Sequence, residues 1–230
     1  MESMYTLSVV PAIIPKNPEM LRAALQRVAG VASDVQIDIV DGVFVPHMSW
    51  PYNTGAEDGV AVLASLIPAS MTYEFDLMVA DPLALLARLS DAQPARVVLH
   101  LESLAADERR VHEVIDAVRA RGARAVLAVQ NDTPLETLAP YVPHIDGVQC
   151  MGIAHIGVQG EPFDARVLAR IKWLRDEYSQ LSISVDGSVN KETIRMLKEA
   201  GANRFVAGSA IFNAEDPRAA YRALCDMVGA

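Results

Sequence analysis

Val-Gln-Ile-Asp-Ile-Val-Asp-Gly, at residues 35–42, is the segment from which the fold prediction starts. Its first six residues form an apolar run of strand length, and Gln36 and Asp38 fall on one face of an extended chain because side chains alternate along a strand. Asp41-Gly42 then gives a turn signal. The stretch predicts a strand that carries polar side chains on one face.

Seven further apolar runs of strand length occur along the chain, at residues 6–14, 71–79, 96–101, 123–129, 145–151, 181–185 and 204–207. Helical patterns separate them: one from Pro18, one from Pro82, and others at 107–121, 135–139, 164–178, 190–200 and 216–228. Proline in a first turn and glycine after a last turn are typical helix boundaries. Strands and helices are therefore expected to alternate along the whole chain.

Eight strand–helix units within 230 residues predict a parallel sheet closed into a (β/α)8 (TIM) barrel, as a single domain over residues 1–230. An open sheet with six or seven true units is the alternative. In these barrels the chemistry lies at the carboxyl ends of the strands, so the polar residues there are the candidates for function.

Composition narrows the function classes. A net charge of −9 and a pI near 5.0 argue against nucleic-acid binding. No apolar run is long enough to span a bilayer, and the first residues do not have the pattern of a signal peptide, so we expect a cytoplasmic protein without a membrane partner. Cys150 and Cys225 fit no metal-binding or redox spacing and are expected to be reduced thiols.

Acidic residues mark the strand ends. Asp38 and Asp76 lie inside apolar runs, and Asp186 follows the seventh run. A buried carboxylate needs a partner, a metal ion or a raised pKa. Any one of them alone can be a loop cap, but three directed at one barrel mouth indicate a site. Asp41, in its turn, is expected to hold the following loop together.

Small residues follow the last two strands. Gly187-Ser188 comes after the seventh strand, and Gly208-Ser209 comes after the eighth and begins a short helix. Turns at these positions commonly bind phosphate through backbone N–H groups. The two turns predict a phosphate site.

Five segments, in this order, resemble the ribulose-phosphate 3-epimerase family. Residues 35–47 resemble its second-strand motif, and residues 206–212 (Val-Ala-Gly-Ser-Ala-Ile-Phe) resemble its last-strand phosphate motif. Residues 10–14, 75–79 and 184–189 resemble its first-, third- and seventh-strand motifs. The resemblance covers nearly the whole chain and implies a ribulose-phosphate binding barrel that forms homo-oligomers.

The resemblance also implies an activity, the epimerisation of a phosphorylated ketose at C3. Asp38 and Asp186 would be the two acid–base residues, one on each face of the sugar. Met78 and Met151 would line the reacting centre, and Gly187, Ser188, Gly208 and Ser209 would bind the phosphate. His47 stands where the family has Asn, and its place in a strand-end loop predicts a contact with the substrate.

The metal-ligand positions depart from the family, whose shell is two His and two Asp. The His positions hold Gln36 and Asp76 here, so the expected shell is Gln36, Asp38, Asp76 and Asp186. Without a cation the three carboxylates would repel one another, so either a metal is bound or one Asp is protonated. The cofactor expected is a divalent cation, Mg²⁺, Mn²⁺ or Zn²⁺, and an oxygen shell favours the first two over zinc. Loss of the metal, with altered or lost activity, is the alternative.

Other interpretations stay open. His47, His100 and His155 lie at or after strand ends. Each is either a substrate contact or an ordinary hydrogen-bonded or exposed histidine. A decarboxylase or aldolase on the same barrel is a second function, although residues 38–41 lack the Asp-x-Lys pattern of the decarboxylases. A non-catalytic phosphosugar-binding barrel is a third.

Overall fold

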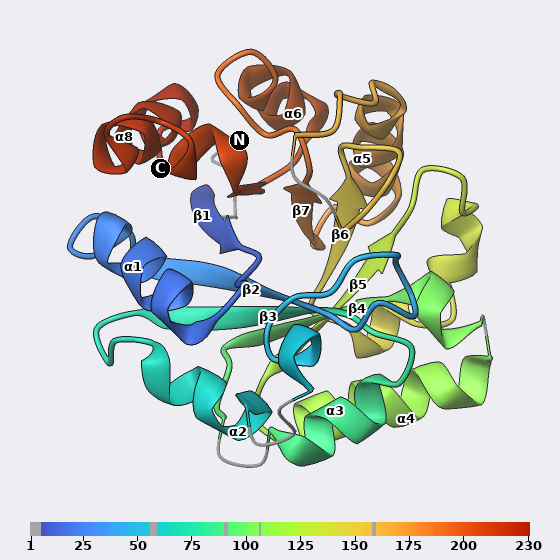
Figure 1. Ribbon diagram of the computed structural model, residues 1–230. Helices are drawn as coiled ribbons and strands as arrows, with labels where there is room; N and C mark the ends of the chain where they lie inside the picture. Colours follow the sequence, from blue (N-terminus) through green and yellow to red (C-terminus); the bar gives the residue numbers. More distant parts are fainter. Residues whose placement is uncertain (1–5, 56–58, 90–91, 106, 158–159) are drawn as a thin grey trace.

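Eight parallel strands close into a barrel in sequence order (Figure 1). The computed structural model describes residues 6–55, 59–89, 92–105, 107–157 and 160–230. The strands are β1 (Ser8–Ile13), β2 (Asp34–Val40), β3 (Thr72–Met78), β4 (Arg96–His100), β5 (Arg124–Val129), β6 (Gly147–Met151), β7 (Ser182–Asp186) and β8 (Arg204–Ala207). Pairing of β1 with β8 closes the sheet, which confirms the predicted barrel and rules out the open sheet.

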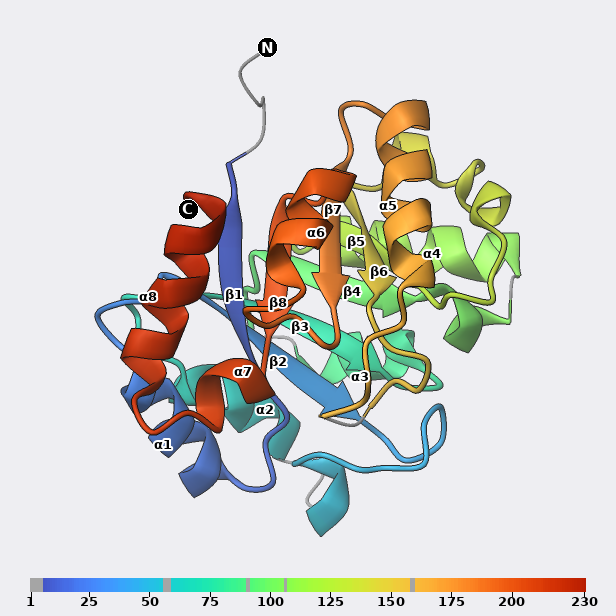
Figure 2. The ribbon, with the colours of Figure 1, turned by 90° about the horizontal axis from the view of Figure 1, so that it is seen from above.

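Helices surround the barrel: α1 (Pro18–Val28), α2 (Gly59–Leu63), α3 (Pro82–Arg88), α4 (Glu108–Arg119), α5 (Arg166–Glu177), α6 (Ile194–Ala200), α7 (Ser209–Phe212) and α8 (Pro217–Val228). Figure 2 shows the four-residue α7 at the carboxyl end of β8. The sequence analysis missed α2, and the helix expected at 135–139 is a 3₁₀ helix, Leu135–Leu138. None of the described helices is long and apolar enough to cross a membrane.

Side-chain caps mark where α1, α3, α4 and α8 begin. The Asn17 side chain accepts a hydrogen bond from the Met20 N–H (2.7 Å), and Asp216 accepts two at the start of α8. Each of these two caps precedes a proline, whose missing N–H costs nothing in a first turn. These local signals fix the length of each crossover and so the position of the next strand.

The apolar core lies between the barrel and its helices, where the outward-facing strand side chains pack against buried helix faces. The inside of the barrel differs, because polar side chains from β2, β3, β4, β6, β7 and β8 contact one another there. Small apolar clusters share that space, among them Val10, Ala12 and Val206, and Val98, Val126 and Ala128. The barrel interior therefore holds the molecule's buried charge.

An ion cluster lies toward the amino-terminal end of the barrel. The Glu74 carboxylate, 3% exposed, contacts Arg204 Nη2 at 2.8 Å and Arg96 Nε at 3.4 Å. Burial raises the pKa of Glu74, and the two guanidinium groups oppose that rise. The cluster joins β3, β4 and β8 at the end of the barrel opposite the strand carboxyl ends.

Removing Glu74 should destabilise the protein without altering its site. Glu74→Ala leaves Arg96 buried without a carboxylate, so the free energy of unfolding should fall by about 3–5 kcal/mol. Urea denaturation measures it, and Glu199→Ala, at an exposed position on α6, is the matched control with an expected change within about 0.5 kcal/mol. Equal losses in the two variants would show that the cluster does not stabilise the barrel.

Candidate active site

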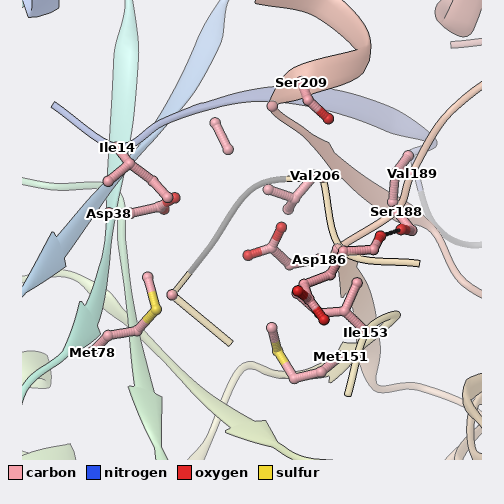
Figure 3. A pocket seen from close by; sticks show the side chains of 16 residues that line it. Ile14, Asp38, Met78, Met151, Ile153, Asp186, Ser188, Val189, Val206 and Ser209 are labelled. Carbon is pink, nitrogen blue, oxygen red and sulfur yellow. Dashed lines mark hydrogen bonds between the residues drawn. The ribbon is translucent and has the colours of Figure 1, made fainter. Parts of the chain in front are cut away.

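A cavity opens at the carboxyl ends of the strands, and both predicted acid–base residues line it (Figure 3). Asp38 comes from β2 and Asp186 ends β7. Figure 3 shows both carboxylates directed into the same cavity, with Met78 and Met151 beside them. The remaining lining residues are Ala12, Ile14, Ile153, Gly157, Gly160, Glu161, Gly187, Ser188, Val189, Val206, Gly208 and Ser209.

Strand register brings these side chains together. Asp38 is level with Asp76 across β2 and β3, and Asp186 is level with Met151 across β7 and β6. Side chains alternate between the two faces of β2, so Gln36 points to the same side as Asp38 and lies two residues deeper in the barrel. Residues far apart in sequence therefore meet in the barrel interior.

Gln36 connects the two aspartates. Its Nε2 donates to Asp38 Oδ1 at 2.9 Å and to Asp186 Oδ2 at 3.4 Å. Gln36 is fully buried, and its Oε1 has no hydrogen-bond partner among the described residues. Only the NH2 end of an amide can donate to carboxylates, so this orientation follows from the chemistry.

Asp76 belongs to a second hydrogen-bonded group. Its Oδ1 lies 2.8 Å from His100 Nε2, and its Oδ2 accepts from Gln149 Nε2 at 2.8 Å. All three residues are fully buried. Burial lowers the pKa of His100, but the Asp76 carboxylate outweighs that effect and leaves the pKa above its ordinary value. His100 is thus a hydrogen-bonded core histidine, one of the two interpretations that the sequence left open.

The four expected metal ligands do not fit a metal ion in this arrangement. Gln36 presents N–H donors, and not its oxygen, to Asp38 and Asp186, while both oxygens of Asp76 are already occupied by donors. Among the described residues, no group of three or more His, Cys, Asp or Glu side chains is placed to hold a metal. A cation needs lone pairs converging on one point, and this donor set does not supply them.

Burial and neighbouring negative charge raise the pKa values of the two cavity carboxylates. Burial raises the pKa of Asp38 well above its ordinary value, and the charges of Asp186 and Asp76 raise it further. Burial raises the pKa of Asp186 to about 7, with Asp76 adding to the effect and the Gln36 hydrogen bond opposing it. Near neutral pH the pair therefore holds a proton, which is the state a proton-transfer site requires.

The loop after β2 covers the mouth of the barrel. Asp41 holds it, as predicted, by accepting hydrogen bonds from the N–H groups of Val43, Phe44 and Ala80. The Phe44 ring lies 5.4 Å from the His100 ring, centroid to centroid. Val40, Val45, Met78, Met151 and Ile156 form an apolar cluster with Phe44. The loop thus gives the two carboxylates an apolar surround.

The two glycine-containing turns form another part of the cavity wall, where Figure 3 shows Ser188 and Ser209 away from the methionines. Gly187 has a φ of +97°, and a Cβ there would lie 2.6 Å from Ile153 Cγ1, so only glycine fits. Thr193 Oγ1 donates to the Ser188 carbonyl at 2.7 Å and anchors this turn to the start of α6. The predicted phosphate residues Gly187, Ser188, Gly208 and Ser209 all line the cavity.

Two predicted or candidate histidines lie elsewhere. His47 is exposed in the loop after β2 and does not line the cavity, so its contact with substrate stays a prediction. His155 is exposed and lies 3.1 Å from Glu161. The cavity also includes Ile153, Gly157, Gly160 and Glu161 of the loop after β6, which were not among the predicted site residues. This loop follows a strand end but differs in sequence from the family's loop at that place, so its contacts could not be assigned from the sequence.

Comparisons with known proteins match this chain to one family. The profile of the "Ribulose-phosphate 3 epimerase family" matches residues 8–212. The ribulose-phosphate 3-epimerase of Mycobacterium tuberculosis H37Rv is 32% identical over 224 residues, which are 93% of this chain and 92% of that protein. The cytoplasmic isoform from Oryza sativa subsp. japonica is 28% identical over 228 residues, 97% of this chain and 95% of that protein.

Solved structures share the fold at lower identity. Orotidine 5'-phosphate decarboxylase from Pyrococcus horikoshii OT3 is 20% identical, with a TM-score of 0.64 over 97% of this chain and all of that chain. 3-Hexulose-6-phosphate synthase from Salmonella typhimurium is 13% identical, with a TM-score of 0.70 over 96% of this chain and 98% of that one. These likenesses concern the barrel and not the reaction.

The raised pKa of Asp186 makes folding stability depend on pH. A carboxyl whose pKa rises from 3.8 to about 7 on folding stabilises the folded state below pH 4, and that stability is lost as the pH rises to 7. Asp186→Asn should remove this loss of stability. Between pH 4 and pH 8, the free energy of unfolding of the variant should therefore rise relative to that of the wild type by on the order of 1–2 kcal/mol, after allowance for the partial exposure of Asp186. Urea denaturation at several pH values measures the difference. Asp226→Asn, at an exposed position of α8, should show a pH-independent difference, and the same flat profile for Asp186→Asn would contradict the pKa assignment.

Proposed function

Because the chain belongs to the ribulose-phosphate 3-epimerase family and is a carbohydrate epimerase, we propose that it inverts C3 of a ketose phosphate by proton transfer between Asp38 and Asp186. The observation that carries the proposal is that both carboxylates line one cavity and accept hydrogen bonds from one amide, that of Gln36. A ketopentose phosphate is the proposed substrate, after the relatives' printed activity.

The chemistry needs one ionised and one protonated carboxyl group. The ionised aspartate takes the proton from C3, the electrons of the C–H bond move toward the C2 carbonyl oxygen, and the protonated aspartate returns a proton to the opposite face of C3. The reverse reaction exchanges the two roles. Burial and neighbouring negative charge raise the pKa values of both aspartates, which favours a proton on the pair near neutral pH and supports this assignment.

The rest of the cavity has complementary roles. The turns at Gly187-Ser188 and Gly208-Ser209 provide backbone N–H groups for the phosphate, which an acidic chain can use without net positive charge. Met78 and Met151 form an apolar wall that limits water at the reacting carbon and strengthens electrostatic interactions there. A cytoplasmic location and a homo-oligomeric state remain predictions from the sequence.

Single-aspartate variants test the assignment because each base serves one face of the sugar. Asp38→Asn and Asp186→Asn should each lower epimerisation by at least about 100-fold. In D2O each variant should still exchange the C3 hydrogen of one epimer, and the two variants should select opposite epimers. NMR of ribulose 5-phosphate and xylulose 5-phosphate measures both quantities.

Asp226→Asn is the matched control and should keep wild-type rates. Epimerisation at the wild-type rate in either active-site variant, or exchange of the same epimer by both, would refute the two-base assignment. Carbon–carbon cleavage by the wild type would show the decarboxylase or aldolase alternative, and binding without exchange would show the non-catalytic one.

A further inference from the structure

We propose that Gln36 takes the place of a metal ion between Asp38 and Asp186, so that this epimerase works without a divalent cation. The inference rests on the proposed function and concerns the same site. It makes Gln36 a positioning residue, which acts on the substrate only through the two carboxylates that it holds.

The first support is the geometry of the amide. A single Nε2 lies within hydrogen-bond distance of Asp38 Oδ1 and Asp186 Oδ2, and the NH2 group has one hydrogen for each of them. A cation bound by both carboxylates would compete with these two hydrogens for the same lone pairs. A neutral donor at this place reduces the repulsion between the carboxylates, which is one task that a metal would otherwise perform.

The second support comes from Asp76, at the other altered ligand position. His100 Nε2 and Gln149 Nε2 each lie 2.8 Å from one of its oxygens, so its carboxylate is engaged on both sides. Asp76 is also fully buried and does not line the cavity. The two positions that differ from the family, Gln36 and Asp76, are therefore compatible with each other: Gln36 donates to the acid–base pair, and Asp76 is held within the barrel wall.

The third support is the character of the surrounding side chains. Val40, Val45, Met78, Met151 and Ile156 form the apolar cluster over this part of the barrel. These aliphatic and thioether groups offer no oxygen ligand for a hard cation. Phe44 packs against this cluster and against His100. The carboxylate of Asp41, in the loop after β2, already accepts hydrogen bonds from the N–H groups of Val43, Phe44 and Ala80.

Metal content is the first test, because it does not depend on activity. Wild-type protein, purified and dialysed with a chelator, should contain only substoichiometric metal by mass spectrometry of the elements, and it should keep its epimerase and exchange rates. A stoichiometric metal that the chelator removes together with activity, and whose return restores activity, overturns the proposal.

Gln36→Glu is the second test, because it keeps the shape of the side chain and exchanges donors for lone pairs. The variant should lose at least about 100-fold in kcat with little change in KM, since Gln36 does not line the cavity. It should also bind one Mn²⁺ per chain through the introduced carboxylate together with Asp38 and Asp186, measured by calorimetry, where the wild type binds none. Gln26→Glu, at an exposed position of α1, is the control and should resemble wild type in both measurements.

The outcomes separate the two proposals. Unchanged kcat in Gln36→Glu, or equal Mn²⁺ binding by wild type and variant, refutes the role of Gln36 even if the protein is an epimerase. A wild type that is inactive toward ketose phosphates with and without Mg²⁺, Mn²⁺ or Zn²⁺ refutes the proposed function, while the Mn²⁺ titrations still decide whether Gln36 occupies the cation's place.

Discussion

Buried negative charge is the constraint on which this structure depends. The charges of Asp186 and Asp76 raise the pKa of Asp38, and the charge of Asp76 raises the pKa of Asp186, because all three side chains lie within one barrel. Asp76 is hydrogen-bonded to His100 and Gln149, whereas Asp38 and Asp186 share the Gln36 amide, and burial favours their protonated forms. The same arrangement that makes these groups costly to bury makes them suitable for moving protons.

The two ends of the barrel differ in role: the amino-terminal end contributes stability, and the carboxyl end carries the candidate site. Toward the amino-terminal end, the Glu74 carboxylate is paired with Arg96 and Arg204 in an ion cluster. Toward the carboxyl end, most of the donors to the carboxylates are neutral amides. They form hydrogen bonds with the negative charge there but do not neutralise it. Loops after β2 and β6 then enclose the carboxylates, and the two glycine-containing turns are placed to hold the anionic end of a substrate.

Much of the fold was predictable because its signals are local. Strand-length apolar runs and the helix starts at Asn17 and Asp216 predicted the barrel, and the position of Asp38 and Asp186 at strand ends predicted a shared cavity. The pairing of Asp76 with His100 and Gln149 was not predictable, because it joins three strands across the barrel and depends on register. The direction of the Gln36 amide likewise follows from its two acceptors, which the sequence does not show to be neighbours. The helix α2 was missed because five residues give too short a period to recognise.

A crystal structure with bound xylulose 5-phosphate is the most direct test of the two-aspartate assignment. The sugar carbon C3 should lie between the Asp38 and Asp186 carboxylates, one on each face, with the phosphate at the backbone of residues 187–188 and 208–209. A sugar that presents the same face of C3 to both carboxylates, or a phosphate bound away from these turns, would contradict it.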